Sequence, residues 1–378
     1  MMSSGKFLIK LIYTGGTIGG ESRGGRRLNS DLQVKQLLDK LKDKESFGGP
    51  ISAIVDEVNV STPVKEFSEN FVPDDWVEIA KVVKKSIDEN KYDAIIILHG
   101  TDTMTYTAAA LTFLIQGVKM PVILTGSNLP ITDKNTDSIK NIEDAIKIAL
   151  KKKEELKGVF LSFAGSSKGQ SFVHLGNRCR KIMAEPYSNN FESVNVTPIA
   201  KVSDGIFGKR IKMLNTQLLE QVSKKNSNRE LKLYDKICSN VEVLKIYPGF
   251  NPQVELYKIK QANSKGVILE IYVSGTACVK PGKYSLIPFL EELRDRKIPI
   301  FLVSAEKGTI KTDIYGSSGE LIKAGACPLG DMITEAAYTK LCWVLGHTDG
   351  YKQVVEKMKK NIAAEITAEK NKNLSGGE

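Results

Sequence analysis

The sequence predicts an α/β fold with a larger, doubly wound, mostly parallel sheet domain followed by a smaller α/β domain. Apolar runs typical of buried strands alternate with segments of helical periodicity, and the same alternation starts again after a polar interval. A chain of 378 residues also exceeds the usual size of one hydrophobic core. We therefore expect an N-terminal domain over residues 1–205, a linker over 206–240 and a C-terminal domain over 241–378.

The N-terminal domain is expected to alternate buried strands with helices. The expected strands are the apolar runs Phe7–Tyr13, Ala94–Leu98, Pro121–Thr125 and Gly158–Phe163. The expected helices span Trp76–Asn90, about Thr105–Gly117 and about Asn141–Lys152, the first after the helix-start signal Pro73-Asp74-Asp75. This alternation predicts a parallel sheet with right-handed crossovers.

A polar, lysine-rich stretch from about Asp204 to Asn240 is typical of a linker or an excursion. After it the expected strands and helices are Val241–Tyr247, Gly266–Val273, a helix near Tyr284–Arg296, Pro299–Val303, a helix from about Met332 to Leu345 and a mixed-charge terminal helix. The second domain is therefore smaller and again α/β.

The composition, 41% hydrophobic and 26% charged, is typical of a globular protein. The first apolar run is interrupted by Lys10 and no run approaches the length of a membrane span, so we expect a cytoplasmic protein without a membrane partner. The five cysteines are scattered and form no C-x-x-C motif, which indicates free thiols. None of the three histidines clusters with cysteines, so no metal site is expected.

The net charge of +10 raises the question of a nucleic-acid partner. The lysines lie mostly on helix-like segments, where they are mixed with acidic residues. Such runs are typical of solvated helix faces, and no aromatic-rich RNA-binding motif accompanies them. We therefore expect no nucleic-acid partner.

Two short threonine motifs carry the chemistry that the sequence offers. Thr14–Gly20 reads Thr-Gly-Gly-Thr-Ile-Gly-Gly and follows the first expected strand, and His99–Met104 reads His-Gly-Thr-Asp-Thr-Met and follows the second. Both would emerge at the carboxyl ends of parallel strands, where ligands bind in α/β sheets. Two hydroxyls, a carboxylate and backbone N–H groups would then reach one pocket. This arrangement predicts a nucleophilic site without a serine triad.

Each motif has a simpler interpretation when it is taken alone. Gly15 and Gly16 could form a plain strand-to-loop turn, and their spacing fits neither of the common nucleotide-binding glycine patterns. Thr101-Asp102 could be only a helix N-cap. A helix N-cap at Thr101-Asp102 would not explain the first motif.

Together, in this order and separated by one α/β unit, the motifs resemble the bacterial-type L-asparaginase family and, within it, the cytosolic type I branch. The resemblance runs from about Leu8 to Ala368. Further matches to the family pattern are Asp75-Trp76 after Ser68, Leu124–Pro130, Asp137 with Asn141, Gly176–Arg178 with Lys181, Phe191 with Ser193 and Asn195, Ile246–Gly249, Asp331-Met332, Thr334–Ala336 and Lys340-Leu341.

The resemblance implies a role for each matching residue. Thr17 takes the position of the family's nucleophile, and Thr101, Asp102 and Lys181 take those of its Thr-Asp-Lys triad. Ser68 lies where the family binds the substrate's α-carboxylate, and Asp102 is also positioned to hold the α-ammonium group. The other residues expected at the substrate are Gly16, Glu69, Gly100 and Ser127.

These residue types suit amide hydrolysis. A threonine hydroxyl is a poor nucleophile until a base takes its proton, and a desolvated lysine near Thr101 could be that base while Asp102 orients it. Backbone N–H groups beside Thr101 and Gly16 could stabilise an oxyanion by about 3 kcal/mol per donor. The resemblance implies a covalent aspartyl-enzyme released by water, and spacing leaves open which threonine attacks first.

Three positions depart from the family pattern. The segment Gly19–Asn29 contains no tyrosine, whereas many relatives place one there to bond the nucleophile; Tyr315 could replace it or could be a packed structural residue. Glu69 stands where the family has glutamine or serine, and it could pair with the substrate's ammonium group. Ala305 replaces an effector-site cysteine, so allosteric activation by asparagine is not expected.

The sequence therefore predicts a cytoplasmic L-asparaginase that converts L-asparagine to L-aspartate and ammonia without cofactor or metal. The resemblance implies a homodimer or a dimer of dimers. One alternative is the asparaginase-like subunit of a tRNA-dependent amidotransferase, which normally has a domain before the first motif, whereas sixteen residues precede Thr17 here. The other is a binding module that kept the fold and lost the chemistry.

Overall fold

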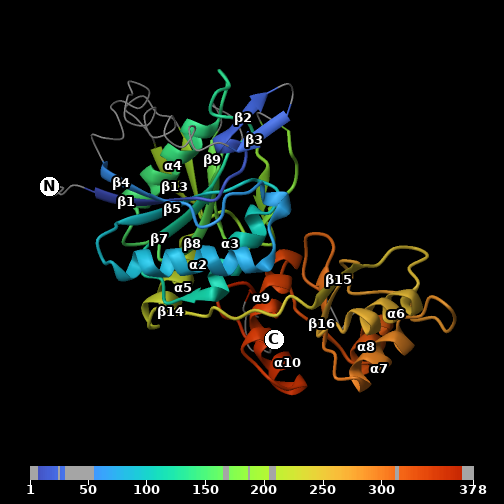
Figure 1. The fold of residues 1–378 in the computed structure, drawn as a ribbon. Helices are drawn as coiled ribbons and strands as arrows, with labels where there is room; N and C mark the ends of the chain where they lie inside the picture. The colour runs from blue at the N-terminus through green and yellow to red at the C-terminus, as the bar shows by residue number, and fades with distance from the viewer. Residues whose placement is uncertain are drawn as a thin grey trace, which may run out of the picture. The chain divides into compact units, whose positions relative to one another are not determined.

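The computed structural model describes residues 7–23, 26–29, 55–164, 170–185, 188–203, 210–310 and 315–367. The chain divides into two compact units, unit 1 over Met1–Asp235 and unit 2 over Lys236–Glu378 (Figure 1). Both units are built from sheets and helices, as the sequence predicts.

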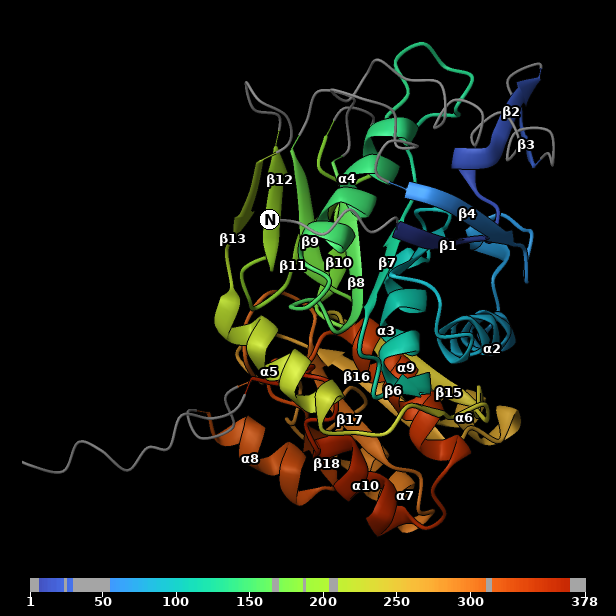
Figure 2. The same ribbon diagram turned by 90° about the vertical axis from the view of Figure 1, so that its left-hand side faces the viewer.

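A mixed, mostly parallel sheet forms the centre of unit 1. Its eight described strands lie in the order β13-β12-β9-β8-β7-β5-β1-β4, with β13 and β4 at opposite edges (Figure 2). Their bounds are β1 Phe7–Tyr13, β4 Val55–Ser61, β5 Ala94–Leu98, β7 Pro121–Thr125, β8 Gly158–Phe163, β9 Ser171–Leu175, β12 Ala200–Ser203 and β13 Arg210–Met213. The neighbours from β4 to β8 pair in parallel, and β9, β12 and β13 continue the sheet in antiparallel pairs.

The central strands β5, β7 and β8 are buried along their whole length. Parallel strands that are covered on both faces read as continuous apolar runs, which is why the sequence predicts β1, β5, β7 and β8 with the bounds observed. The polar residues that follow β1 and β5 are thereby held at the carboxyl edge of the sheet.

Helices with buried apolar residues accompany this sheet. They are α2 Pro73–Asp88, α3 Met104–Leu114, α4 Ser138–Lys151 and α5 Thr216–Ser227. Both α3 and α4 contact β7 and β8, and α2 packs against α3. The first turn of α2 contains Pro73, and Val72 N donates to the Asp75 carboxylate at 2.7 Å, so the predicted helix start is confirmed.

Short elements make up the rest of the secondary structure in the described part of unit 1. These are the 3₁₀ turns η1 Thr17–Gly19 and η4 Ser68–Asn70, the hairpin strands β2 Gly20–Arg23 and β3 Arg26–Asn29, the antiparallel pair β10 Cys179–Lys181 and β11 Phe191–Ser193, and the pair β6 Ile115–Gln116 and β14 Lys232–Leu233. Of the predicted tyrosine-free segment 19–29, residues 24 and 25 lie outside the described residues.

The range expected to be a linker, 206–240, differs from that expectation over most of its length. It contains β13, α5 and β14, and the first compact unit extends to Asp235. Helix α5 is polar overall, yet Leu218, Leu219 and Val222 are buried on one side of it, and Asn215 caps its start by accepting from Leu218 N at 3.1 Å. Three apolar side chains in a lysine-rich segment were too weak a pattern to predict a packed helix.

Unit 2 has a parallel sheet of its own in the order β15-β16-β17-β18. Figure 1 shows α6, α7 and α8 on one side of this sheet and α9 and α10 on the other. The bounds are β15 Val241–Lys245, β16 Gly266–Ile271, β17 Ile300–Ser304, β18 Ala326–Pro328, α6 Pro252–Ala262, α7 Ile287–Asp295, α8 Gly316–Lys323, α9 Thr334–Gly346 and α10 Tyr351–Lys359. The helix expected near Tyr284 begins three residues later, at Ile287.

Among the helices of the described ranges, none combines the length and the apolar character that a membrane crossing requires.

Candidate active site

The two threonine motifs meet at the carboxyl edge of the sheet in unit 1. Strands β1 and β5 are parallel neighbours whose last paired residues are Tyr13 and Leu98. Directly beyond them, Thr14 donates to the Leu98 carbonyl through both its backbone N–H and its Oγ1, each at 3.0 Å. The hydroxyl of Thr14 therefore ties the start of the first motif to the end of β5, directly before the second motif.

Glycine makes the close contact between the motifs possible. Gly16 has φ +85°, and a Cβ atom there would lie 2.5 Å from the Gly100 Cα. A Cβ atom on Gly100 would in turn lie 2.5 Å from Ser68 Oγ. Only residues without a side chain allow such an approach, so the expected site residues Gly16, Gly100 and Ser68 come together from three segments of the chain.

Thr101, Asp102 and Lys181 form a connected cluster. Lys181 Nζ donates to Thr101 Oγ1 at 2.9 Å and to Asp102 Oδ1 at 2.6 Å. The lysine side chain is 16% exposed and the aspartate 58%, so the amine is covered while the carboxylate faces solvent. The lysine nitrogen therefore lies within proton-transfer distance of the Thr101 hydroxyl.

Ser68 is tied to the second motif by two hydrogen bonds. Its hydroxyl accepts from Asp102 N at 3.2 Å, and its carbonyl accepts from Thr103 Oγ1 at 2.7 Å. The side chain is buried, whereas Glu69, the next residue of η4, is exposed. Asp102 and Ser68, the residues expected to bind the two ends of an amino acid, are thus neighbours.

Glu66, which the sequence analysis does not single out, organises the approach to Ser68. Its Oε1 accepts from Phe67 N at 2.8 Å and from Asn70 Nδ2 at 3.1 Å. The Phe67 N–H and then the Asn70 amide lower the pKa of this carboxyl. A carboxylate followed by an amide side chain four residues later is too common a pattern to predict this turn from sequence.

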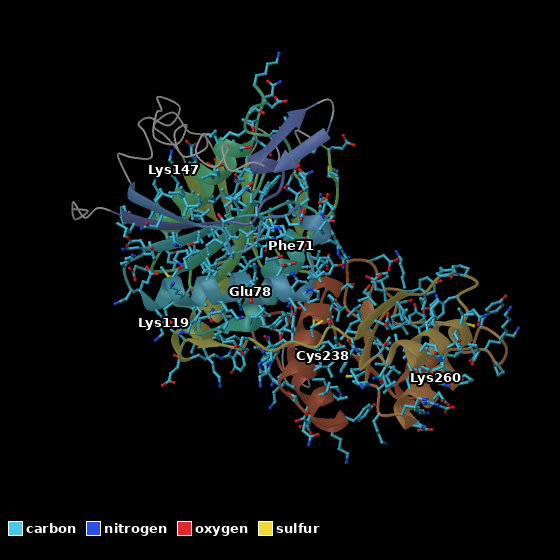
Figure 3. All side chains as sticks on the ribbon, in the orientation of Figure 1. Phe71, Glu78, Lys119, Lys147, Cys238 and Lys260 are labelled. Carbon is cyan, nitrogen blue, oxygen red and sulfur yellow. The ribbon has the colours of Figure 1, made fainter. Side chains whose placement is uncertain are left out.

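His99 supports the second motif through hydrogen bonds within the protein interior. It is fully buried, and burial lowers its pKa from 6.5 to about 4, so the ring is neutral. Its Nδ1 lies 2.7 Å from the Gly100 carbonyl, and its Nε2 lies 2.8 Å from Thr107 Oγ1. Phe71, labelled in Figure 3, contacts the histidine ring at 4.6 Å between centroids. Both ring nitrogens are occupied, so His99 acts as a structural support of this loop.

The structure also describes the other residues expected at the site. Ser127 is buried, and its hydroxyl donates to the Leu129 carbonyl at 2.7 Å within its own loop. Thr17 is the first residue of η1 and is partly buried. Tyr315 belongs to unit 2, where it is 50% exposed and precedes α8. Its pairing with Thr17 stays a prediction.

The donor set suits a charged organic substrate. Hydroxyl, carboxylate, amine and backbone N–H groups meet here, and among the described residues no three His, Cys, Asp or Glu side chains gather as metal ligands would. Such a set can bind both ends of an amino acid and present a hydroxyl to a carbonyl carbon.

Family models match both parts of the chain. The model described as "Asparaginase, N-terminal" matches residues 8–216, and "Glutaminase/Asparaginase C-terminal domain" matches residues 240–358.

Two kinds of named protein are similar in sequence. The L-asparaginase of Thermococcus kodakarensis is 33% identical over 78% of this chain and 82% of its own length. A subunit of the glutamyl-tRNA(Gln) amidotransferase of Methanothermobacter thermautotrophicus is 32% identical over 79% of this chain. The matched region spans 64% of the length of that second relative.

Solved structures agree with the family match. The thermostable L-asparaginase from Thermococcus kodakarensis superposes with a TM-score of 0.78 at 28% identity, covering 96% of this chain and 100% of the other. L-asparaginase I from Vibrio cholerae gives the same TM-score at 27% identity, with the same coverage.

Proposed function

We propose, from the premise that this chain belongs to the asparaginase family, that it hydrolyses the side-chain amide of L-asparagine to L-aspartate and ammonia. The observation that carries the proposal is the Lys181 amine, which contacts Thr101 Oγ1 at 2.9 Å beside the Gly16–Gly100 contact. The L-asparaginase relative and the solved asparaginase structures support the choice of substrate.

Substrate recognition in this proposal uses the two ends of the amino acid. The hydroxyl of Ser68 would bind the α-carboxylate, and the Asp102 carboxylate would bind the α-ammonium group through a charge-assisted hydrogen bond. Ser68 Oγ and Asp102 N are 3.2 Å apart, which supports a single compact binding site for both groups. Glu69 adds a second carboxylate next to Ser68 and would strengthen the demand for a free amine.

In the acylation step the Lys181 amine acts as the proton acceptor. A threonine hydroxyl, Thr17 in the family assignment, bonds to the amide carbon, and its proton passes to the amine through the Thr101 cluster. Backbone N–H groups beside Gly16 and Thr101 would stabilise the oxyanion, each by about 3 kcal/mol. The C–N bond then breaks, the nitrogen takes the proton from Lys181, and ammonia leaves an aspartyl ester on threonine.

Deacylation repeats the same proton transfers with water. Water gives its proton to Lys181 and bonds to the ester carbon, and the threonine oxygen recovers a proton as the C–O bond breaks. The net reaction consumes asparagine and water and needs neither redox chemistry nor a cofactor. We also propose a cytoplasmic homodimer or dimer of dimers.

A second candidate function is ammonia supply within a tRNA-dependent amidotransferase. The relatives named as subunits of glutamyl-tRNA(Gln) amidotransferase support it, at 32% identity in the Methanothermobacter protein. The chemistry at Thr101 and Lys181 would be the same, but turnover would depend on a partner and on charged tRNA. A binding module that lacks the chemistry would release no ammonia in either case.

One experiment separates these functions. Ammonia release is measured with L-asparagine and L-glutamine side by side, with and without glutamyl-tRNA(Gln). We expect release from asparagine alone; release that requires the charged tRNA would support the amidotransferase function, and no release under either condition would support the binding module.

A further inference from the structure

Lys181 lies at the end of a short strand and is followed by exposed residues. It is the last residue of β10, a strand of three residues, and it pairs with Phe191 of β11. The next two side chains, Ile182 and Met183, are 45% and 42% exposed. Strand pairing alone therefore gives little reason for the amine to stay within hydrogen-bond distance of Thr101.

The side chain of Asn190 binds the backbone of the segment that follows β10. Its side chain is fully buried, and its Nδ2 donates to the Met183 carbonyl at 3.0 Å and to the Glu185 carbonyl at 3.2 Å. The backbone carbonyl of Asn190 accepts a hydrogen bond from Ile182 N at 2.8 Å. The side chain of Asn190 thus holds Met183 and Glu185, and its backbone holds Ile182, which directly follows Lys181.

A further hydrogen bond connects Asn190 to the loop that follows strand β7 of the sheet. Asn190 Oδ1 accepts from Asn128 Nδ2 at 2.8 Å, and Asn128 N donates to both oxygens of the buried Asp137 carboxylate at 3.0 Å. Asn141 bonds the same carboxylate at 3.1 Å and the Gly126 carbonyl at 2.9 Å. The connection after Lys181 is therefore anchored to the loop that follows β7.

The chemistry of the amide makes asparagine specific at this position. Both N–H donors meet carbonyl oxygens and the side-chain oxygen meets a donor, so both ends of the amide are engaged. A buried amide with complete hydrogen bonding is held in one orientation, and losing it leaves carbonyls unpaired. Alanine and serine at this position cannot supply two donors and one acceptor.

We propose that Asn190 is a positioning residue that keeps the Lys181 amine at Thr101 and Asp102. The proton-transfer role of the amine rests on the proposed function. The placement of the amine by Asn190 does not depend on that function. The Asn190 side chain bonds Asn128 and the carbonyls of Met183 and Glu185, none of which is proposed to bind the substrate, so we expect its loss to change the position of the base and to leave the substrate-binding residues in place.

The test compares Asn190→Ala with Asn189→Ala. Asn189 is the same residue type one position earlier, and it is partly buried. Its Oδ1 accepts a long hydrogen bond of 3.5 Å from Phe191 N. We expect Asn190→Ala to lower kcat by about tenfold or more, because a misplaced catalytic group has effects of this size. KM should stay within about threefold of wild type, since the residues proposed to bind the substrate are unchanged. Asn189→Ala should change neither constant by more than about twofold.

A second readout does not depend on turnover. The folded proteins are exposed briefly to acetic anhydride, and acetylation of Lys181 is measured by peptide mass spectrometry against Lys153, which is paired with Asp93 at 3.0 Å. Release of the amine from its two bonds should raise Lys181 labelling by about threefold or more in Asn190→Ala and leave it unchanged in Asn189→Ala. Equal labelling in the two variants would overturn the proposal.

Folding of each variant is checked by circular dichroism. If Asn190→Ala does not fold, Asn128→Ala replaces it, because this change removes the lateral bond to Asn190 Oδ1 and leaves its bonds to Met183 and Glu185. Raised Lys181 labelling in Asn128→Ala supports the proposal, and labelling equal to wild type contradicts it. If the wild type releases no ammonia, the proposed function is overturned. If Lys181 labelling is still raised in the variant, the role of Asn190 in placing the amine is nevertheless supported.

Discussion

At the scale of single residues, the threonine hydroxyls of the two motifs have different surroundings. The hydroxyl of Thr14 donates to the Leu98 carbonyl, and that of Thr103 donates to the Ser68 carbonyl, so both hold backbone together. The hydroxyl of Thr101 instead receives a hydrogen bond from the Lys181 amine. This difference supports Thr101, of the three, as the residue that exchanges a proton.

Valine substitutions separate these roles because valine keeps the branched shape and removes the hydroxyl. We expect Thr17→Val and Thr101→Val each to lower kcat for asparagine by several orders of magnitude, since members of one catalytic unit act together. Thr14→Val is the control and should keep kcat within about threefold. Either catalytic variant retaining more than about a tenth of the wild-type kcat, a loss of only ~1.4 kcal/mol, would show that its assignment is wrong.

The neutral state of His99 makes stability depend on pH. Burial lowers its pKa from 6.5 to about 4, so as the pH falls the unfolded chain takes up a proton before the folded one. The stabilisation is complete above pH 6.5 and is lost progressively towards pH 4. Between pH 7 and pH 5 this loss should be about 2 kcal/mol.

We expect His99→Gln to flatten the pH dependence of the free energy of unfolding by about this amount, measured by urea titration at both pH values. His174, whose pKa burial lowers to about 3, remains and leaves a residual dependence in the variant. Parallel pH profiles for wild type and His99→Gln would mean that His99 is not the group responsible.

At the scale of elements, the contact between the two strand-end loops determines the site. Gly16 and Gly249 both have positive φ, +85° and +94°, but a Cβ atom at Gly16 would meet Gly100, whereas none would meet anything within 4 Å at Gly249. Gly249→Ala should therefore cost only about 1 kcal/mol of stability, the cost of the left-handed backbone. Gly16→Ala should cost more and lower kcat by at least about a hundredfold, because it moves Gly100 and Thr101. Similar stability and kcat in the two variants would argue against a tight crossing of these loops.

Element by element, the sequence predicts what burial makes distinctive. The strands β5, β7 and β8 are covered on both faces and read as apolar runs, so their bounds follow from the sequence. Strand β12 alternates buried and half-buried residues over four positions, which is too short a pattern to recognise. The contact between Lys181 and Thr101 spans 80 residues of sequence and was expected only from family resemblance. Asn190 carries no sequence signal, because its role depends on the pairing of β10 with β11 and on a distant asparagine.

At the scale of the whole molecule, unit 2 contains a fully buried ion pair far along the sequence from the candidate site. Lys340 Nζ lies 2.6 Å from Glu365 Oε1, and both side chains are 0% exposed. The lysine also donates to the carbonyls of Met358 and Lys360, and the carboxylate accepts from Ile362 N and Ala363 N. This cluster attaches the segment after α10 to α9.

Removing the lysine leaves the Glu365 carboxylate fully buried without its oppositely charged partner. We expect Lys340→Met to lower the free energy of unfolding of the full chain by about 3–5 kcal/mol, measured by urea denaturation. The control is Lys258→Met, which removes a surface pair with Glu255 whose lysine is 63% exposed, and it should cost less than about 1 kcal/mol. A cost for Lys340→Met no larger than that of the control would exclude this role for the pair.

The most direct test of amide hydrolysis by the threonine–lysine cluster is steady-state ammonia release from free L-asparagine, without tRNA, by wild type and by Lys181→Met. Methionine keeps most of the length of lysine and removes the amine that contacts Thr101 and Asp102. We predict turnover by the wild type and a loss of at least about a hundredfold in kcat for the variant across the pH range. A Lys181→Met protein as active as wild type, or a wild type that releases ammonia only when charged tRNA is added, would contradict it.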